Sequence, residues 1–180
     1  GKPSQRVAQT ATLSVDADPN PYVSRAALKL AHAIETFSLD PSGAVALDLG
    51  ASTGGFTQVL LEAGARQVTA IDVGRDQIAR ALRADPRVRV IEGLNARDLT
   101  SDHAPPPDWI TADLSFISLA KALPPALALA LPGAVLVALI KPQFEVGPDF
   151  VGKGGIVKNA EAIERTRTDV ATFLQDSGWN

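Results

Sequence analysis

After the turn at residues 40–43, the apolar positions of the chain alternate between two patterns. Continuous apolar runs are typical of strands buried on both faces, and the stretches between them repeat apolar residues every three to four positions, as helices do. The runs predict strands at 45–49, 67–71, 88–91, 109–112 and 134–140. The intervening stretches predict helices near 56–63, 77–84 and 118–131. This alternation predicts right-handed βαβ units and an α/β fold with a doubly wound, central parallel sheet.

One more helix is expected before this alternation and another after it. The first has Ser24 as its N-cap, buries apolar residues at helical spacing and projects Arg25, Lys29 and His32 together from its other face. The last runs from about Asn159 to Asp176 and has its own apolar stripe. Both fit a sheet that carries helices on its two faces.

The segment from Leu123 to Ile140 contains no charged residue, which is the first requirement for a membrane-spanning helix. Pro124, Pro125 and the Pro132-Gly133 pair interrupt it. We therefore interpret it as the end of a helix, a turn and a buried strand, and expect no membrane span.

Composition excludes several kinds of site. The 180 residues suit about one domain, and 46% hydrophobic with 21% charged residues is ordinary for a globular chain. Cysteine is absent, which excludes disulfides, thiolate metal ligands and thiol nucleophiles. The two histidines stand far apart without a zinc-binding spacing, so no protein-held metal is expected. A net charge of −3 counts against a domain that binds nucleic acid unaided.

Both ends of the sequence lead us to expect a fragment of a longer chain. The chain opens on Gly1 rather than Met, and residues 1–21 are polar without a helical period, as expected of a linker. The chain stops just after the last predicted helix, where an open sheet would normally add a strand. We expect a linker at 1–21 and a C-terminally incomplete domain at 22–180.

A glycine-rich turn follows the first predicted strand and opens a helix. It contains Gly50, Gly54 and Gly55, and Asp72 ends the next strand, where a carboxylate can hold the hydroxyls of a ribose. Dinucleotide sites prefer G-x-G-x-x-G, but the spacing here is G-x-x-x-G-G with Asp48 just ahead. A carboxylate there would repel a pyrophosphate and suit the cationic end of S-adenosylmethionine, which we favour. Two alternatives remain: a site for a dinucleotide, and a turn that only packs a helix on a strand.

Asn95 follows the third strand, where this fold would place an adenine ring. Its amide could meet the ring edge, or Asn95 could simply stabilise a surface turn.

Charged residues end the fourth and fifth strands. Asp113 and Lys141 directly follow apolar runs, and the carboxyl ends of parallel strands meet at one edge, so the two could approach one another. Two interpretations explain charged residues at these strand ends. They could form an ion pair, or they could activate a hydroxyl for attack on a methyl sulfonium. Lys29 could add a second cation or remain solvated. The direction of Glu145, four residues after Lys141, is left open.

Several motifs occur together in one order: Tyr22-Val23-Ser24-Arg25, DLGASTGGFT, AIDVG, ADLSFIS, KPQFE and VGKGGIV. In this combination the chain resembles the TlyA-type (hemolysin A) branch of the FtsJ-like ribosomal RNA methyltransferases, over about residues 1–180. The resemblance implies a Rossmann-like class-I methyltransferase fold with strand order 3-2-1-4-5, and S-adenosylmethionine-dependent ribose 2′-O-methylation of ribosomal RNA in the cytoplasm.

The resemblance also implies the site residues. A Lys–Asp–Lys–Glu tetrad falls on Lys29, Asp113 and Lys141, and no counterpart of its Glu occurs before the chain ends. The expected cofactor contacts are Asp48, Gly50, Ser52, Gly54, Gly55, Phe56, Asp72, Asn95 and Asp113, although Asn95 stands where the wider FtsJ-like pattern has Asp.

The family carries an RNA-binding domain ahead of the catalytic one, of which residues 1–15 resemble a remnant. Contact with ribosomal RNA or a ribosomal subunit is expected through that part, so we expect these 180 residues alone to methylate RNA weakly or not at all. A methyltransferase for a small molecule or a protein, and a non-enzymatic hemolysin-like protein, remain alternatives.

Overall fold

A computed structural model describes residues 8, 10 and 20–180 of the chain, so the predicted linker at 1–21 lies almost wholly outside the described residues. Five parallel strands form one sheet in the order β3-β2-β1-β4-β5, which confirms the predicted order. The strands are β1 (Val45–Leu49), β2 (Gln67–Asp72), β3 (Val88–Glu92), β4 (Trp109–Ala112) and β5 (Val135–Ala138).

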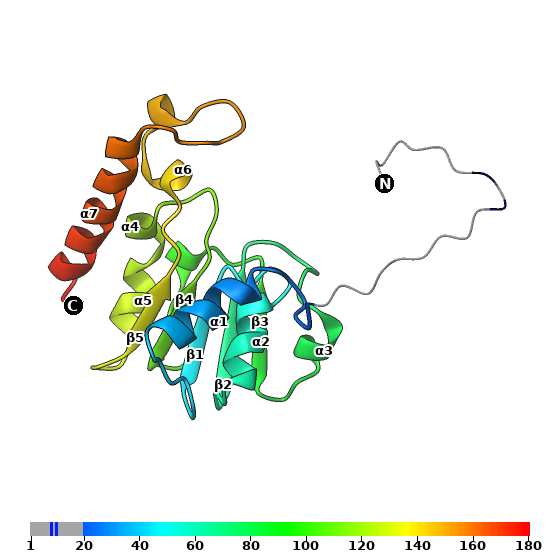
Figure 1. The fold of residues 1–180 in the computed structure, drawn as a ribbon. Coiled ribbons are helices and arrows are strands. Elements are labelled where there is room, and N and C mark those ends of the chain that lie inside the picture. The colour runs from blue at the N-terminus through cyan, green and yellow to red at the C-terminus, as the bar shows by residue number, and fades with distance from the viewer. Residues whose placement is uncertain (1–7, 9, 11–19) are drawn as a thin grey trace.

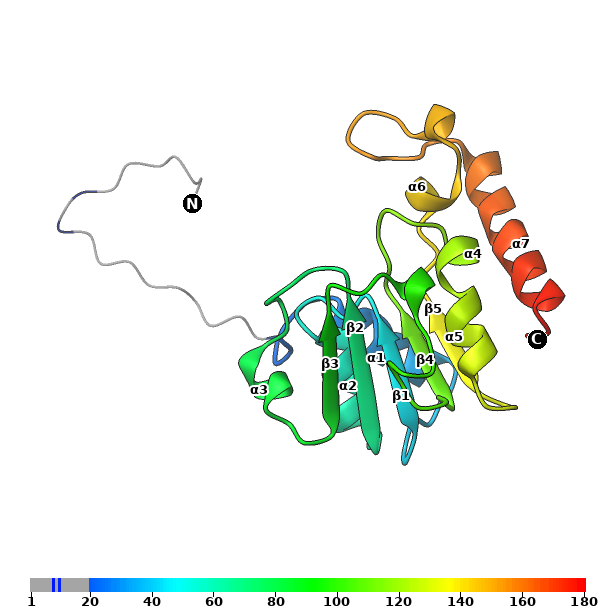
Figure 2. The same ribbon diagram turned by 180° about the vertical axis from the view of Figure 1, so that it is seen from behind.

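Helices join successive strands and flank the sheet. They are α1 (Ala27–Thr36), α2 (Gly55–Glu62), α3 (Arg80–Arg83), α4 (Leu119–Ala122), α5 (Pro124–Leu129), α6 (Pro142–Glu145) and α7 (Ala160–Asp176), with short 3₁₀ turns η1 (Ala96–Asp98) and η2 (Pro148–Phe150). Figures 1 and 2 show α1 and α2 over one face of the sheet and α4, α5 and α7 over the other.

The core is split by the sheet into two apolar layers. Leu30 of α1 and Leu60 of α2 are fully buried in one layer, and Leu119 of α4 and Val170 of α7 lie in the other. The central strands are buried on both faces, which is why they read as unbroken apolar runs rather than as alternating ones. This packing fixes the carboxyl ends of β1, β4 and β5 beside one another.

Several predicted helix boundaries differ from the structure. The helix expected at 118–131 is interrupted at Leu123, between α4 and α5, because Pro124 has no N–H for the helical ladder. Only 80–83 of the segment 77–84 is helical. Ser24 is not an N-cap: α1 begins at Ala27, and the Ser24 carbonyl accepts a hydrogen bond from the Ala27 N–H.

The helix at the end of the chain is predicted correctly. Asn159 is the N-cap of α7, and its side chain accepts a hydrogen bond from the Ala162 N–H at 3.0 Å. In the described part of the chain no helix combines the length and the apolar character that crossing a membrane requires. The uncharged segment at 123–140 is instead α5, a turn and β5, as the prolines indicated.

Candidate active site

The glycine turn after β1 is fixed to the end of β2. The N–H groups of Gly50 and Ala51 both donate to the Ile71 carbonyl, at 2.9 and 3.1 Å. Gly50 has a φ of +81°, and a Cβ at this position would lie 2.8 Å from the carbonyl oxygen of Asp113. Glycine is therefore required here, and its absence of a side chain places the turn directly against the end of β4.

Gly54 and Gly55 bring the start of α2 close to neighbouring elements. Gly54 has a φ of +97°, and a Cβ would collide with the Leu82 side chain. A Cβ at Gly55 would collide with the Ser24 hydroxyl and come within 3.0 Å of the Ala27 nitrogen. These two glycines let the start of α2 pack closely against its neighbours, and their expected contact with a cofactor stays a prediction.

The Asp48 side chain points into the core beneath the glycine turn, and its expected contact with a cofactor stays a prediction. Its side chain is fully buried, and its two oxygens accept hydrogen bonds from the hydroxyls of Thr57 at 2.7 Å and Thr111 at 3.0 Å. Burial raises the pKa of the Asp48 carboxyl to about 6, against the lowering effect of both threonines. Asp48 therefore supports the site from beneath by joining β1, α2 and β4.

Asp72 lies at the carboxyl end of β2, as expected, and holds the turn. Its oxygens accept hydrogen bonds from the Ser52 N–H and the Gly74 N–H, each at 2.7 Å. Ser52 takes a left-handed φ of +49° to make this contact. Each carboxylate oxygen retains a further lone pair, so Asp72 can still accept from a ribose hydroxyl.

Asn95 stabilises a turn in the structure. Its side-chain oxygen accepts a hydrogen bond from the Arg97 N–H at 3.2 Å and caps η1. Of the two roles considered for Asn95, the structure shows this one.

Lys29, Asp113 and Lys141 meet at the carboxyl edge of the sheet. Lys141 Nζ lies 2.5 Å from Asp113 Oδ1, and Lys29 Nζ lies 3.3 Å from Asp113 Oδ2. Lys141 also donates to the Ser115 hydroxyl at 3.1 Å. The Lys141 side chain is 19% exposed and that of Lys29 is 51% exposed, so Lys141 is held and Lys29 approaches from solvent.

These groups line a cavity of about 260 Å³ between α1, the glycine turn and the ends of β4 and β5. Its lining residues are Ser24, Ala26, Lys29, Gly50, Ala51, Ser52, Thr53, Gly55, Phe56, Asp113, Ser115 and Lys141. Seven of the predicted site residues are among them, while Asp48, Gly54, Asp72 and Asn95 are not.

An aromatic pair beside the lysine was missed by the sequence reasoning. Phe116 is 91% exposed and has a φ of +64°, and its ring centroid lies 5.1 Å from that of Phe144. Lys141 Nζ lies 6.0 Å from the Phe144 centroid. The apolar residues of ADLSFIS and KPQFE gave no sign that both rings would stay near the surface. A large apolar side chain left exposed next to charged groups is a feature of binding surfaces.

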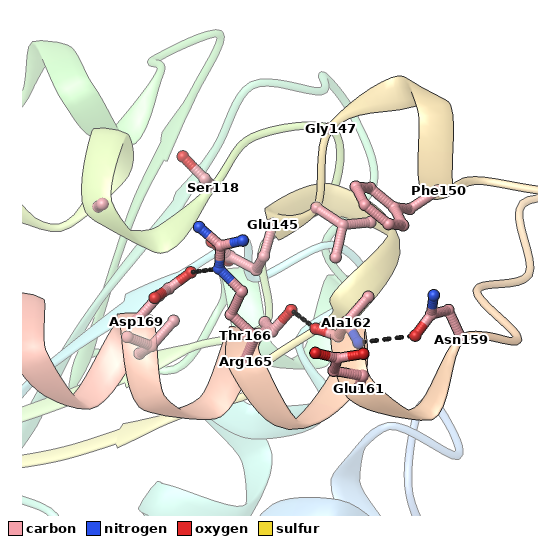
Figure 3. Close-up of a pocket in the computed structure, with 13 residues that line it drawn as sticks. Ser118, Glu145, Gly147, Phe150, Asn159, Glu161, Ala162, Arg165, Thr166 and Asp169 are labelled. Atoms are coloured by element: carbon pink, nitrogen blue, oxygen red, sulfur yellow. Dashed lines mark hydrogen bonds and ion pairs between the residues drawn. The ribbon is translucent and has the colours of Figure 1, made fainter.

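A second, larger cavity of about 530 Å³ lies between α4, α6 and α7. Its lining contains none of Lys29, Asp113 and Lys141. Figure 3 shows Glu145 of α6 among the lining residues, together with Arg165 and Asp169 of α7. Glu145 accepts a hydrogen bond from the Leu119 N–H at 2.9 Å, and partial burial raises the pKa of its carboxyl. The structure thus settles the direction of a side chain that the sequence left open.

The described residues contain no group of three or more acidic or histidine side chains that could hold a metal ion. They do fit S-adenosylmethionine. The Ser52 N–H of the turn donates to Asp72, whose carboxylate is placed to accept from a ribose hydroxyl. The cavity beside the turn is also lined by Lys141 and Asp113. Residues 50–56 would therefore lie along the cofactor, with its methyl end toward the two lysines.

Residues 22–180 match the model of the FtsJ-like methyltransferase family. The 16S/23S rRNA (cytidine-2′-O)-methyltransferase TlyA of Mycobacterium tuberculosis is 48% identical over 99% of this chain and 68% of its own length. Hemolysin A of Brachyspira hyodysenteriae is 40% identical over 88% of this chain and 67% of its own length.

A solved structure of a hemolysin-named protein from Streptococcus thermophilus superimposes with a TM-score of 0.85 at 41% identity, over 91% of this chain and 60% of that one. This chain thus spans about two thirds of the length of these relatives. The matches confirm the resemblance to the TlyA branch and the Rossmann-like fold that it implied. The chain belongs to the FtsJ-like methyltransferase family, whose methyl donor is S-adenosylmethionine.

Proposed function

We propose that this chain transfers a methyl group from S-adenosylmethionine to a ribose 2′-hydroxyl of ribosomal RNA. The observation that carries the proposal is the meeting of Lys29, Asp113 and Lys141 next to the glycine turn. A cation-rich site at the end of a cofactor groove suits a substrate with a phosphate–ribose backbone. The names of the relatives support the same reaction.

The cofactor, when bound, supplies a methyl group on a positively charged sulfur. The task of the chain is to place a hydroxyl oxygen in line with that methyl group. Lys141 is suited to this task because Asp113 and Ser115 fix its Nζ. The Lys141 ammonium can donate a hydrogen bond to the hydroxyl oxygen, and the Asp113 carboxylate beside it can accept the hydroxyl proton.

Lys29 holds the outer side of Asp113 and is half-exposed, so its cation is available to an RNA phosphate. Phe116 and Phe144 lie on the same side of the site as Lys141. Their exposed rings would let the base of the target nucleotide stack while its ribose enters the site. The target nucleoside is cytidine, which is the nucleoside in the names of two relatives.

The expectation of a linker at 1–21, which would connect this domain to an RNA-binding domain, is part of the proposal. It agrees with relatives that are about half as long again as this chain. Ribosomal RNA as substrate also places the protein in the cytoplasm.

The test is an assay with methyl-labelled S-adenosylmethionine against separate pools of ribosomal subunits, naked ribosomal RNA, proteins and metabolites. From these 180 residues alone we expect at most weak label, and we expect that label in ribosomal RNA, where nucleoside analysis should return 2′-O-methylcytidine. A Lys141→Ala variant should lose this product. Label only in proteins or in metabolites would identify a methyltransferase of another class. Release of haemoglobin from erythrocytes without any methyl transfer would favour a hemolysin instead.

A further inference from the structure

Three successive contacts join the loop after β4 to the helix after β5. Asp113 pairs with Lys141 at 2.5 Å, the Phe116 ring meets the Phe144 ring at 5.1 Å between centroids, and the Leu119 N–H donates to Glu145 at 2.9 Å. The contacts follow one another in the same order along both segments. They hold residues 113–119 and 141–145 together as one unit, which reaches from the smaller cavity to the larger one.

Helix α6 cannot hold its own position. It is a single turn of four residues, none of its residues is buried, and no side chain caps its N-terminus. Isolated single turns are unstable because the conformational entropy lost on forming the first turn exceeds the free energy gained from its one hydrogen bond. Lys141 is the N-cap residue of this turn, so any rotation of α6 moves the Lys141 backbone directly.

Glu145 supplies the anchor at the far end of that turn. It accepts from the first N–H of α4, where the N-cap residue, Ser118, makes no side-chain cap. The Leu119 side chain is 2% exposed and α4 packs in the core, so α4 is a firm support. A carboxylate on such an N–H forms a stronger hydrogen bond than a neutral acceptor does.

We propose that Glu145 is a positioning residue for Lys141: by holding α6 against the start of α4, it keeps the Lys141 amine on Asp113. The inference deepens the proposed function, on which the catalytic meaning of Lys141 rests. Glu145 itself lies on the far side of α6, in the lining of the larger cavity. It therefore acts through the short helix and not on the substrate.

The position of Glu145 also predicts a pH response. Partial burial raises the pKa of its carboxyl, so Glu145 takes up a proton at a higher pH than an exposed glutamate does. The charged groups that face it across the cavity are Glu161, Arg165 and Asp169 of α7, and Arg165 is already paired with Asp169 at 3.6 Å. A neutral Glu145 would be a weaker acceptor for Leu119, and the Lys141 amine would be held less firmly.

The test measures the position of Lys141 without relying on methyl transfer. The full chain is acylated briefly with an N-hydroxysuccinimide ester, and mass spectrometry gives the labelling rate of Lys141 relative to Lys29. In Glu145→Ala this ratio should rise about tenfold, because a charge-assisted hydrogen bond is lost. Glu145→Gln keeps an acceptor and should give a smaller rise. Glu161→Gln, in the same cavity, is the matched control and should match the wild type.

A second measurement separates positioning from general damage to the fold. At saturating cofactor, Glu145→Ala should lower kcat for ribosomal RNA while the Kd for S-adenosylmethionine stays within about twofold, since no residue of α6 lines the cavity that contains the turn at 50–56. An unchanged Lys141-to-Lys29 ratio in Glu145→Ala would overturn the proposal. Equal acceleration at both lysines would also overturn it, since that shows loosening of the whole domain. A wild-type chain without methyl transfer leaves this test intact, because the labelling ratio still reports on Glu145, whereas label only in proteins or metabolites would count against the proposed function alone.

Discussion

The hydroxyl of Thr111 donates a hydrogen bond to the buried carboxylate of Asp48 at 3.0 Å, across the two central strands of the sheet. Thr111 stands two residues before Asp113, and Asp48 stands two residues before Gly50. The bond therefore joins the strand that leads to Asp113 to the strand that leads into the glycine turn. A charged group is placed inside the core at this point, and its ionisation must affect stability.

Asp48 should make the domain less stable as the pH rises from about 4 to about 6. The pKa of its carboxyl is about 6 in the folded chain against 3.8 when exposed, so the folded state binds the extra proton in this range. Ionising the buried group costs the fold about 3 kcal/mol, fully present above the folded pKa and absent below the unfolded one. Urea unfolding from about pH 4 to about pH 7 should show this decline in the wild type and not in Asp48→Asn. Parallel curves for the two proteins would contradict the assignment.

Gly50→Ala should damage the site more than an alanine at another left-handed glycine does. Its Cβ would lie 2.8 Å from the Asp113 carbonyl oxygen, in addition to the cost of a φ of +81°. Gly43 has a φ of +74° and open space around it, so Gly43→Ala carries the backbone cost alone, about 1 kcal/mol. We expect Gly50→Ala to lose at least a further 1–2 kcal/mol, roughly the strain of one forced contact, and to bind S-adenosylmethionine weakly. Calorimetry gives both quantities, and equal losses in the two variants would refute the close approach.

Lys141→Ala should reduce methyl transfer to RNA far more than Lys29→Ala. Lys141 is fixed by Asp113 and Ser115, whereas Lys29 is half-exposed and touches only the outer oxygen of Asp113. We expect a loss of about a hundredfold or more in kcat for Lys141→Ala and about tenfold for Lys29→Ala, in the range of positioned proton-transfer groups. Single-turnover rates at saturating cofactor measure this directly. A Lys29 effect as large as that of Lys141 would show that the two cations act as one unit.

Phe116→Ala should raise the KM for RNA and leave the Kd for S-adenosylmethionine unchanged. Loss of one stacked base costs about 1–3 kcal/mol, which corresponds to a rise of about 5-fold to 150-fold in KM. Phe37, at the end of α1, is also largely exposed, at 69%, and Phe37→Ala is the matched control. If both variants bind RNA as the wild type does, the aromatic pair has no role in substrate binding.

The fold and the meeting of Asp113 with Lys141 could be predicted because both follow from the strands. Continuous apolar runs mark parallel strands buried on both faces, and residues that end such strands share one edge of the sheet. No knowledge of side-chain direction is needed for either step. The same reasoning does not say how firmly the two groups are held.

The surroundings of Asp48 could not be predicted, because they depend on distant partners. Asp48 reads as a ligand contact from its place before the turn, but Thr57 and Thr111, which lie 9 and 63 residues away, enclose it. Asn95 and Phe116 differ for a local reason. Asn95 binds its own turn, and Phe116 takes a left-handed backbone that no pattern of apolar residues predicts.

The contact between Gly50 and the Asp113 carbonyl has a consequence for cooperativity. The turn and the strand end meet without any side chain between them, so a displacement of one by a bound molecule is passed to the other. Cofactor and RNA would then change each other's affinity, and thermodynamics requires the factor to be the same in both directions. Titrations of each ligand in the presence of the other would give that factor. A replacement that inserted a flexible side chain between the two backbones would uncouple them.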